Sequence, residues 1–409
     1  MTSPRTVQRS LAPLLAALAM FGPFAIDTMF PAFPAIAEQF AASPLAMQQT
    51  LSVYMIAYAL MSLLHGPLSD AVGRRPVILV GVAMFVLASI GCALSRNITE
   101  LLLFRALQGL SAGAGLIVGR AIIRDCYEGA EAQKLMATVS MIFGVAPAVA
   151  PIIGGWVVSY ARWPMIFWLL AGFAAILWVF CLRMLPETHP QHQRVVLSVR
   201  TMMHTYAHIA RDRGTLALVL AGTLGFNALF VYIASAPAFV LDLLKLSERE
   251  FAWLFIPAIS GLMLGSFLSG RLAGRIDAVA TIRIGYGLML GATVANIGVA
   301  LLLPQPMLPW SVLPIGLHSM GIGIAFPTLT LLLLDRYPQH RGGASSVQAF
   351  VSLVFSALIA GVLSPLVSGS VLALACTAGA VTVIGFASWL LCCHLQRSVR
   401  STSARSAQS

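Results

Sequence analysis

The chain has 409 residues, of which 59% are hydrophobic and only 10% are charged. Soluble globular proteins carry about 25% charged residues, so an ordinary soluble protein is excluded and lipid is expected to surround most of the chain. Twelve helices of about 20 apolar residues would use roughly 240 residues, which leaves short connections and no large soluble catalytic domain. The apolar stretches run continuously instead of alternating, which disfavours a β-barrel.

Hydropathy predicts an all-α membrane protein with twelve transmembrane helices in two pseudo-symmetric bundles of six. The predicted spans are 11–33, 48–67, 77–95, 100–122, 135–158, 163–185, 214–240, 251–273, 279–302, 308–334, 344–367 and 371–395. We expect an N-terminal bundle over 1–185, a cytoplasmic linker over 186–213, and a C-terminal bundle over 214–409 that ends in a short cytoplasmic tail.

The basic residues have an uneven placement that explains the net charge of +11. If the N-terminus is cytoplasmic, 20 of the 25 Lys and Arg fall in cytoplasmic segments, four fall in outer loops and one, Arg105, lies inside a predicted helix. This bias follows the positive-inside rule. We therefore expect both termini in the cytoplasm, a lipid bilayer around the chain, and no nucleic acid as a partner.

The two halves are weakly repeated along the chain. Gly66 at the end of the second span has a counterpart in Gly270 at the end of the eighth span, and a short basic turn follows each. Two similar six-helix halves are typical of alternating-access transporters, which bind substrate near the bilayer midplane. The sequence contains no G-x-x-x-x-G-K-S/T run, so transport would use an ion gradient, and neither a cofactor nor a metal is expected.

Residues 66–76 read Gly-Pro-Leu-Ser-Asp-Ala-Val-Gly-Arg-Arg-Pro and are predicted to form a tight turn. The turn resembles the signature loop of the major facilitator superfamily, G-x-L-a-D-r-x-G-r-r, except that Ala71 stands where the family usually has a basic residue. The resemblance implies the major facilitator fold and a loop that latches one conformation. The alternative is a solvated loop that only sets topology. The gating role would fall on Gly66, Asp70, Gly73 and Arg74.

The fourth predicted span contains Arg105, followed three residues later by Gln108. An arginine inside an apolar helix is costly enough to need a reason. The pattern resembles the helix-four motif of drug:proton antiporters in the same superfamily, which implies that Arg105 lies near the proton and substrate site. An arginine that extends to the outer membrane surface is the alternative.

The fifth predicted span carries two prolines and two adjacent glycines. Small residues allow close helix packing, and prolines leave backbone hydrogen bonds that neighbouring groups must satisfy. The arrangement resembles the antiporter motif of helix five, although helix packing alone would also explain the glycines. The motif residues are Pro147, Pro151, Gly154 and Gly155.

Asp27 in the first predicted span is the one residue of the 14 Asp and Glu that lies well inside the hydrocarbon region. With a rise of about 1.5 Å per residue, Asp27 and Arg105 are predicted at similar depth in the outer half of the bilayer. A carboxylate there can lose and regain a proton, which a proton-coupled site requires. A static ion pair with Arg105 is the alternative. The ending Asp27-x-x-x-Pro31-x-x-Pro34, with the motifs above, resembles the Bcr/CflA-type multidrug efflux transporters.

A substrate cavity would be lined by polar and aromatic residues of both halves, although each of these is also explained by helix packing. The candidates are Met29, Tyr54, Tyr58, Gln108, Phe143, Asn227, Phe230, Tyr232, His318 and Gln348.

The resemblance implies a proton-coupled antiporter that exports small amphipathic compounds, such as bicyclomycin- or chloramphenicol-like antibiotics or a metabolite, across a bacterial inner membrane. Asp27 would carry the proton, Arg105 would tune its pKa, and the protein would function as a monomer. A proton-coupled importer of a small nutrient is the alternative. An intramembrane enzyme is disfavoured, because the only histidine cluster, in the polar linker, has no convincing acidic partners.

Overall fold

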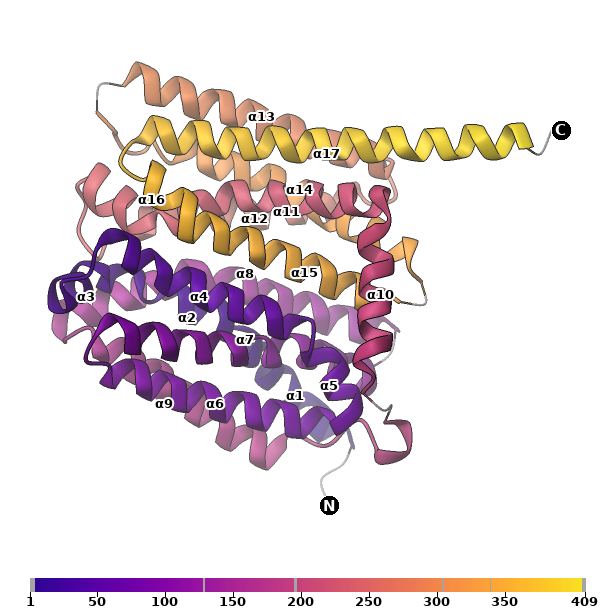
Figure 1. Ribbon diagram of the computed structural model, residues 1–409, viewed down its shortest axis with the longest axis horizontal. Helices are drawn as coiled ribbons and strands as arrows, with labels where there is room; N and C mark the ends of the chain where they lie inside the picture. The colour runs from indigo at the N-terminus through magenta and orange to yellow at the C-terminus, as the bar shows by residue number, and fades with distance from the viewer. Residues whose placement is uncertain (1–3, 128, 195–196, 304, 339, 407–409) are drawn as a thin grey trace. The chain divides into compact units, whose positions relative to one another are not determined.

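The computed structural model describes residues 4–127, 129–194, 197–303, 305–338 and 340–406, and these form helices joined by short connections (Figure 1). The first half contains α1 Pro4–Ala19, α2 Phe21–Asp27, a 3-10 helix Phe30–Ala32, α3 Phe33–Phe40, α4 Pro44–Ser62, α5 His65–Val72, α6 Arg74–Leu94, α7 Ile98–Cys126, α8 Gly129–Tyr160 and α9 Pro164–Met184. A 3-10 helix Gln191–Gln193 and α10 Val199–Arg211 follow.

The second half contains α11 Arg213–Ala234, a π-helix Ala238–Leu243, α12 Ala252–Leu272, α13 Ala278–Leu302, α14 Leu313–Arg336, α15 Arg341–Leu358, a π-helix Ile359–Leu363, α16 Ser364–Val367 and α17 Val371–Ser406. Ten helical segments of the described chain are long and apolar enough to cross a membrane, or eleven if the bent pair α4 and α5 forms one span. The prediction of an all-helical membrane protein is therefore confirmed. The remaining predicted span is α8, whose described apolar stretch, Gly144–Tyr160, is shorter.

Polar side chains mark the starts of several helices. Ser43 accepts a hydrogen bond from the backbone N–H of Ala46 at the start of α4, 3.2 Å away. Asn97 caps α7 by accepting from the N–H of Glu100, and the Glu100 carboxylate accepts from the N–H of Arg96. Such caps satisfy backbone donors that have no partner within the helix. The loops can therefore be short.

The second predicted span corresponds to the pair α4 and α5, called helix two below, and it is bent by 45° between them. In the same way, helix one denotes the run from α1 to α3, helix four denotes α7 and helix five denotes α8. Pro67 has no N–H to donate to the carbonyl of Leu63, so the regular ladder fails there. The ladder resumes where the N–H of Leu68 donates to the carbonyl of Leu64, 2.8 Å away.

The chain forms two compact units, and each includes more than one stretch of sequence. The first unit comprises Met1–Ser198, Ala236–Ile256 and Ala360–Pro365, and the second comprises Val199–Ser235, Pro257–Ile359 and Leu366–Ser409. The units are therefore not contiguous in sequence, whereas the predicted bundles 1–185 and 214–409 are.

In the first unit, α7 packs against α4 and α6, and α6 packs against α9 (Figure 1). Close packing needs glycine where backbones meet: a methyl group on Gly109 of α7 would overlap the carbonyl oxygen of Tyr54 and stand 2.9 Å from Cβ of Ala57 on α4. The glycines of helix four thus bring Arg105 and Gln108 up against helix two.

Two segments from the second half of the chain belong to this first unit. In one of them, Arg249 donates from Nε to Oγ of Ser159, 2.8 Å away, and its guanidinium lies 5.1 Å from the ring centroid of Tyr160. In the other, the carbonyl of Gly361 accepts a hydrogen bond from Nε2 of Gln49, 3.0 Å away. The first unit is therefore completed by residues that are distant in sequence.

In the second unit, α11 packs against α14 and α17, and α13 packs against the same two helices. Helix α11 of this unit is capped at its start by Asp212. The Asp212 carboxylate accepts hydrogen bonds from the N–H of Gly214 and from the hydroxyl of Thr215. Burial alone would raise the pKa of Asp212, but the bonds from Thr215 and Gly214 and the charge of Arg336 lower it overall. Asp212 is therefore ionised at neutral pH and holds the start of α11.

Candidate functional site

Helix one is interrupted directly after Asp27. The carbonyl of Asp27 would need the N–H of residue 31, and that of Phe30 would need the N–H of residue 34, but both positions are proline. The α-helix α2 therefore ends at Asp27, and a 3-10 helix begins at Phe30. The break positions the Asp27 side chain at a helix end inside the first unit.

Asp27 is buried, with 3% of its surface exposed. Within the described part of the chain, no ion pair within 4.0 Å joins Asp27 to Arg105. The static ion pair, which was the alternative interpretation of this residue, is therefore not formed. Asp27 is instead within electrostatic range of the Tyr54 hydroxyl.

Arg105 is completely buried and is held by neutral oxygen atoms. Its Nη1 donates to the carbonyl of Ala25, 3.0 Å away, and to Oε1 of Gln108, 2.8 Å away. Its Nε donates to the carbonyl of Thr50 at 3.3 Å, and its guanidinium lies 4.4 Å from the ring centroid of Tyr54. Helix four thus places a fixed positive charge at the carbonyl of Ala25, two residues before Asp27 in helix one. The Arg105 side chain does not extend to the surface.

One nitrogen of Arg105 is left over. Its Nη2 is buried and has no hydrogen-bond partner among the described residues. A buried unsatisfied donor is costly, so this atom is available to a ligand or a water molecule. Sequence reasoning identified the arginine, but its orphaned donor depends on how three helices meet.

Of the other first-half candidates, Gln108 and Tyr54 contact this arginine. Gln108 donates from Nε2 to Oγ of Ser89, 2.8 Å away, and so extends the polar contacts to α6. The Tyr54 hydroxyl donates to the carbonyl of Gly22, and the rings of Tyr54 and Tyr58 are 6.4 Å apart. Met29 is fully buried at the helix-one break.

Helix five approaches the helix-one break through Gly154. A methyl group there would overlap the carbonyl oxygen of Thr28 and would stand 3.3 Å from Cδ of Pro31. Gly155 makes a similarly close approach to the carbonyl of Glu248. The two glycines thus have separate partners, and Gly154 seals α8 against the residue that follows Asp27.

The prolines of helix five do not end the helix. Pro147 and Pro151 lie inside α8, which continues from Gly129 to Tyr160. The side chain of Phe143 lies outside the residues whose side chains the structure describes.

The loop after helix two is organised by Arg74. Its Nη1 forms an ion pair with Asp70 and donates to Oγ of Ser69, 2.7 Å away. Its Nε lies 3.1 Å from Oδ2 of Asp125 at the end of α7, and its backbone N–H donates to Oε1 of Glu187, 3.0 Å away. These partners of Arg74 all lie in the first unit.

Two glycines of this loop have different surroundings. Gly73 has a φ of +113°, a conformation that side-chain-bearing residues rarely adopt, and a methyl group there would overlap the carboxylate of Glu187. Gly66 has nothing within 4 Å of the position of an added Cβ. The packing at Gly73 therefore requires glycine, while that at Gly66 would accept a larger residue.

Asp125 and Glu187 are the members of this cluster that sequence reasoning missed. Asp125 is 51 residues from Arg74, and Glu187 is 113 residues from it. Their acidic character at helix ends is the signal that could have suggested them, but only the folded chain brings them to Arg74.

The second-half candidates separate into three places. Asn227 on α11 donates from Nδ2 to the carbonyl of Thr223, 3.0 Å away, and accepts at Oδ1 from Oγ of Ser356, 2.9 Å away. Gln348 on α15 donates from Nε2 to Oγ1 of Thr330 at 3.1 Å. Both therefore have partners within the second unit. Phe230 is buried on α11.

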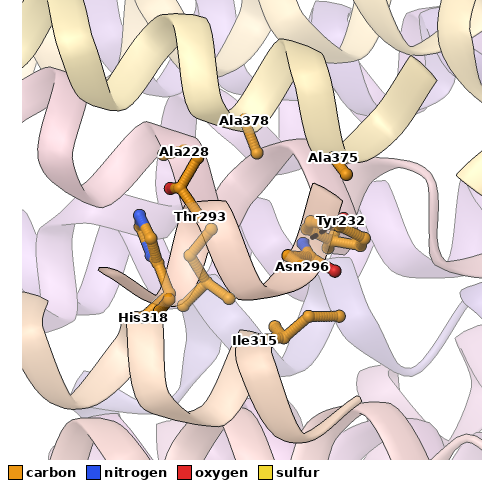
Figure 2. Close-up of a pocket in the computed structure, with 10 residues that line it drawn as sticks. Ala228, Tyr232, Thr293, Asn296, Ile315, His318, Ala375 and Ala378 are labelled. Carbon is orange, nitrogen blue, oxygen red and sulfur yellow. Dashed lines mark hydrogen bonds between the residues drawn. The ribbon is translucent and has the colours of Figure 1, made fainter. Parts of the chain in front are cut away.

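Tyr232 and His318 line one small cavity between α11, α13, α14 and α17 (Figure 2). Nδ2 of Asn296 donates to the Tyr232 hydroxyl, 2.7 Å away, and Nε2 of His318 lies 2.9 Å from Oγ1 of Thr382. The cavity measures about 10 Å³, about the smallest space that holds one water molecule. It has no room for a drug-sized compound.

The geometry is that of a polytopic helical membrane protein, and comparison with known proteins gives its family. Residues 15–365 match the model of the Major Facilitator Superfamily. The chain belongs to this family, whose members are transporters and not enzymes.

Curated relatives and solved structures agree in fold. The chain is 34% identical to YdgK, an MFS-type transporter of Bacillus subtilis (strain 168), over 88% of each chain. It is 30% identical to the multidrug transporter MdfA of Yersinia pestis bv. Antiqua (strain Angola) over 85% of each chain. It is 27% identical to a bicyclomycin resistance protein homolog of Haemophilus influenzae over 90% of this chain and 92% of that one. The structure of the human organic anion transporter MFSD10 superimposes with a TM-score of 0.70 at 18% identity, covering 95% of this chain and all of that one.

Proposed function

We propose that the protein is a proton-coupled antiporter that exports small amphipathic compounds, drugs or a metabolite, across a bacterial inner membrane by alternating access. The observation that carries the proposal is the position of Asp27, buried at a helix break, with Arg105 bonded to the carbonyl of Ala25 two residues before it and Gly154 against the carbonyl of Thr28 directly after it. The similarity to a multidrug transporter and to a bicyclomycin resistance protein homolog supports the substrate class.

Asp27 would carry the coupling proton. An unpaired carboxylate charge is costly inside a membrane protein, so Asp27 can ionise only when something else compensates the charge. Arg105 contributes a constant positive charge because neutral oxygens hold it in place. A cationic or polar substrate would supply the rest of the compensation for the negative charge of Asp27, so that Asp27 loses its proton when the substrate binds. When a proton returns to Asp27, the substrate would be displaced.

The cluster around Arg74 would hold one of the two conformations of the carrier. An alternating-access cycle needs contacts that form in one state and break in the other. Arg74 has two carboxylate partners, Asp70 and Asp125. Both ion pairs would have to break before Arg74 could separate from them, which requires a substantial rearrangement at the end of the bundle that carries the 66–76 loop. In this proposal the loop lies on the cytoplasmic side, as do both termini and the linker 186–213.

The coupling is tested with purified protein in liposomes. Ethidium, a fluorescent lipophilic cation, and chloramphenicol serve as probes, and proton release on probe binding is measured in detergent alongside gradient-driven transport. Asp27→Asn is expected to bind ethidium but to release no proton and to lose gradient-driven exchange. Glu38→Gln, which changes an exposed carboxylate on α3, is the matched control and should behave like the parent.

The result that contradicts the proposal is proton release and exchange by Asp27→Asn at the parental rate. Accumulation of a probe in right-side-out vesicles, instead of inside-out vesicles, would establish import. Orientation is tested separately by reporter fusions after Arg200 and near Gln305. Periplasmic activity at Arg200, or cytoplasmic activity at Gln305, would overturn the topology.

A further inference from the structure

His65 is a buried histidine with one unused ring nitrogen. It begins α5, directly after the bend in helix two, and only 2% of its surface is exposed. The ring is hydrogen bonded to the carbonyl of Met61, while Nδ1 has no partner among the described residues. In the tautomer that carries its proton on Nε2, Nδ1 has a lone pair that can accept a proton.

Tyr58 lies next to this nitrogen. A methyl group on Gly113 of α7 would stand 2.8 Å from Cε2 of Tyr58 and 2.9 Å from Nδ1 of His65. The two side chains therefore meet over the same glycine and are no farther apart than the sum of those distances. On its other side, the ring of Tyr58 lies 3.4 Å from the position of an added Cβ on Gly22 in helix one.

These residues continue a line that starts at Asp27. Asp27 is within electrostatic range of Tyr54, and the ring of Tyr54 is 6.4 Å from that of Tyr58. Tyr54 and Tyr58 are four residues apart and lie on one face of α4. His65 lies beyond the bend and joins them through the position above Gly113. The line of side chains leads toward the loop of Arg74, which follows α5.

The charged groups considered on α6 and α7, the helices packed against α5, act on residues other than His65. From α7, Arg120 lies within electrostatic range of Tyr58, and its positive charge disfavours a further long-lived cation beside that ring. From α6, Arg74 is occupied by Asp70 and Asp125. His65 is therefore suited to pass a proton on instead of retaining it.

We propose that His65 is a second proton-binding group of the transport cycle and passes protons between Asp27 and the end of the bundle that carries the 66–76 loop. The proton that leaves Asp27 reaches the Tyr58 hydroxyl through water, and the hydroxyl passes its own proton to Nδ1 of His65 through a further water molecule, because no direct hydrogen bond joins the two among the described residues. The imidazolium then releases a proton to water at the loop end and returns to the neutral form. The inference rests on the proposed antiport function, and it adds a path to the site at Asp27.

The first test measures the histidine directly. Full-length protein labelled with ¹⁵N-histidine is titrated from about pH 5 to about pH 8, with and without ethidium, and the His65 signals are assigned by their loss in His65→Asn. We expect Nδ1 to become protonated within this range in at least one of the two conditions. A ring that stays neutral throughout both titrations overturns the proposal.

The second test measures transport. His65→Asn is expected to bind ethidium like the parent and to release the same amount of proton, since Asp27 is the source, but about tenfold more slowly. His192→Asn, an exposed histidine in the linker, is the matched control and should match the parent. Tyr58→Phe removes only the hydroxyl and should slow release in the same way, which keeps the test decisive if His65→Asn fails to fold.

The outcomes separate the two hypotheses. If the parent exchanges ethidium for protons but His65→Asn and Tyr58→Phe keep its rate and pH profile, the relay is wrong and the antiport function stands. If the parent neither releases protons nor exchanges ethidium, the antiport function fails and the relay fails with it. A lower unfolding temperature with unchanged proton kinetics would mean that His65 only stabilises the bend.

Discussion

Gly154 is a position where a single methyl group should disturb the packing beside Asp27. An added Cβ would overlap the carbonyl oxygen of Thr28, and it would stand 3.0 Å from the carbonyl carbon of the same residue and 3.3 Å from Cδ of Pro31. Ordinary van der Waals contacts begin at about 3.5 Å. Since most of these atoms are backbone atoms, Gly154→Ala can be accommodated only if α8 moves away from helix one.

The expected cost of this overpacking is about 1–3 kcal/mol. Gly144→Ala is the matched control on the same helix, because no atom of the described residues lies within 4 Å of its added Cβ. Alanine is favoured over glycine in a helix by roughly 0.5–1 kcal/mol, so this control should be neutral or slightly stabilising. The two substitutions add the same atom and should have opposite effects.

Thermal unfolding of the purified protein, followed with a thiol-reactive dye on the buried Cys92 and Cys181, measures both variants. Gly154→Ala should unfold at a lower temperature than the parent, and its ethidium export should fall because helix one is displaced beside Asp27. Equal unfolding temperatures for Gly154→Ala, Gly144→Ala and the parent would refute the reasoning.

Asp125→Asn removes an ionic partner of Arg74 and should cost about 1 kcal/mol, seen as a lower unfolding temperature; an unchanged temperature would mean that Asp70 suffices. Because the pKa of Asp212 is lowered in the folded state, its stabilisation is present above the unfolded pKa of about 3.9 and is lost as the pH falls through the lower folded pKa. Asp212→Asn should therefore show a smaller drop in unfolding temperature between about pH 5 and about pH 3 than the parent, and an equal drop would contradict this account. Tyr232→Phe removes the acceptor of the buried Asn296 donor and should destabilise the protein by about 1 kcal/mol in the same assay, whereas unchanged stability would show that water in the cavity replaces the hydroxyl.

Composition and local chemistry were enough to predict the architecture. A charged fraction of 10% and long apolar stretches require a helical membrane protein, because backbone groups in lipid must be satisfied within each helix. The break after Asp27 was not predicted, since the predicted span 11–33 is continuous, although the prolines at 31 and 34 were a local signal for it, because a missing N–H acts over only four residues. Arg105 was identifiable for a similar reason, because an intramembrane charge is costly wherever its helix packs.

Only the tertiary structure decided which groups meet. Asp125 and Glu187 reach Arg74 across 51 and 113 residues, and Arg105 bonds to the carbonyl of Ala25 and not to Asp27. Tyr232 and His318 line a cavity the size of one water molecule. Hydropathy and motifs report the preferences of each segment for lipid or water, whereas these contacts depend on the rotation and depth of helices whose close approach is permitted by particular glycines.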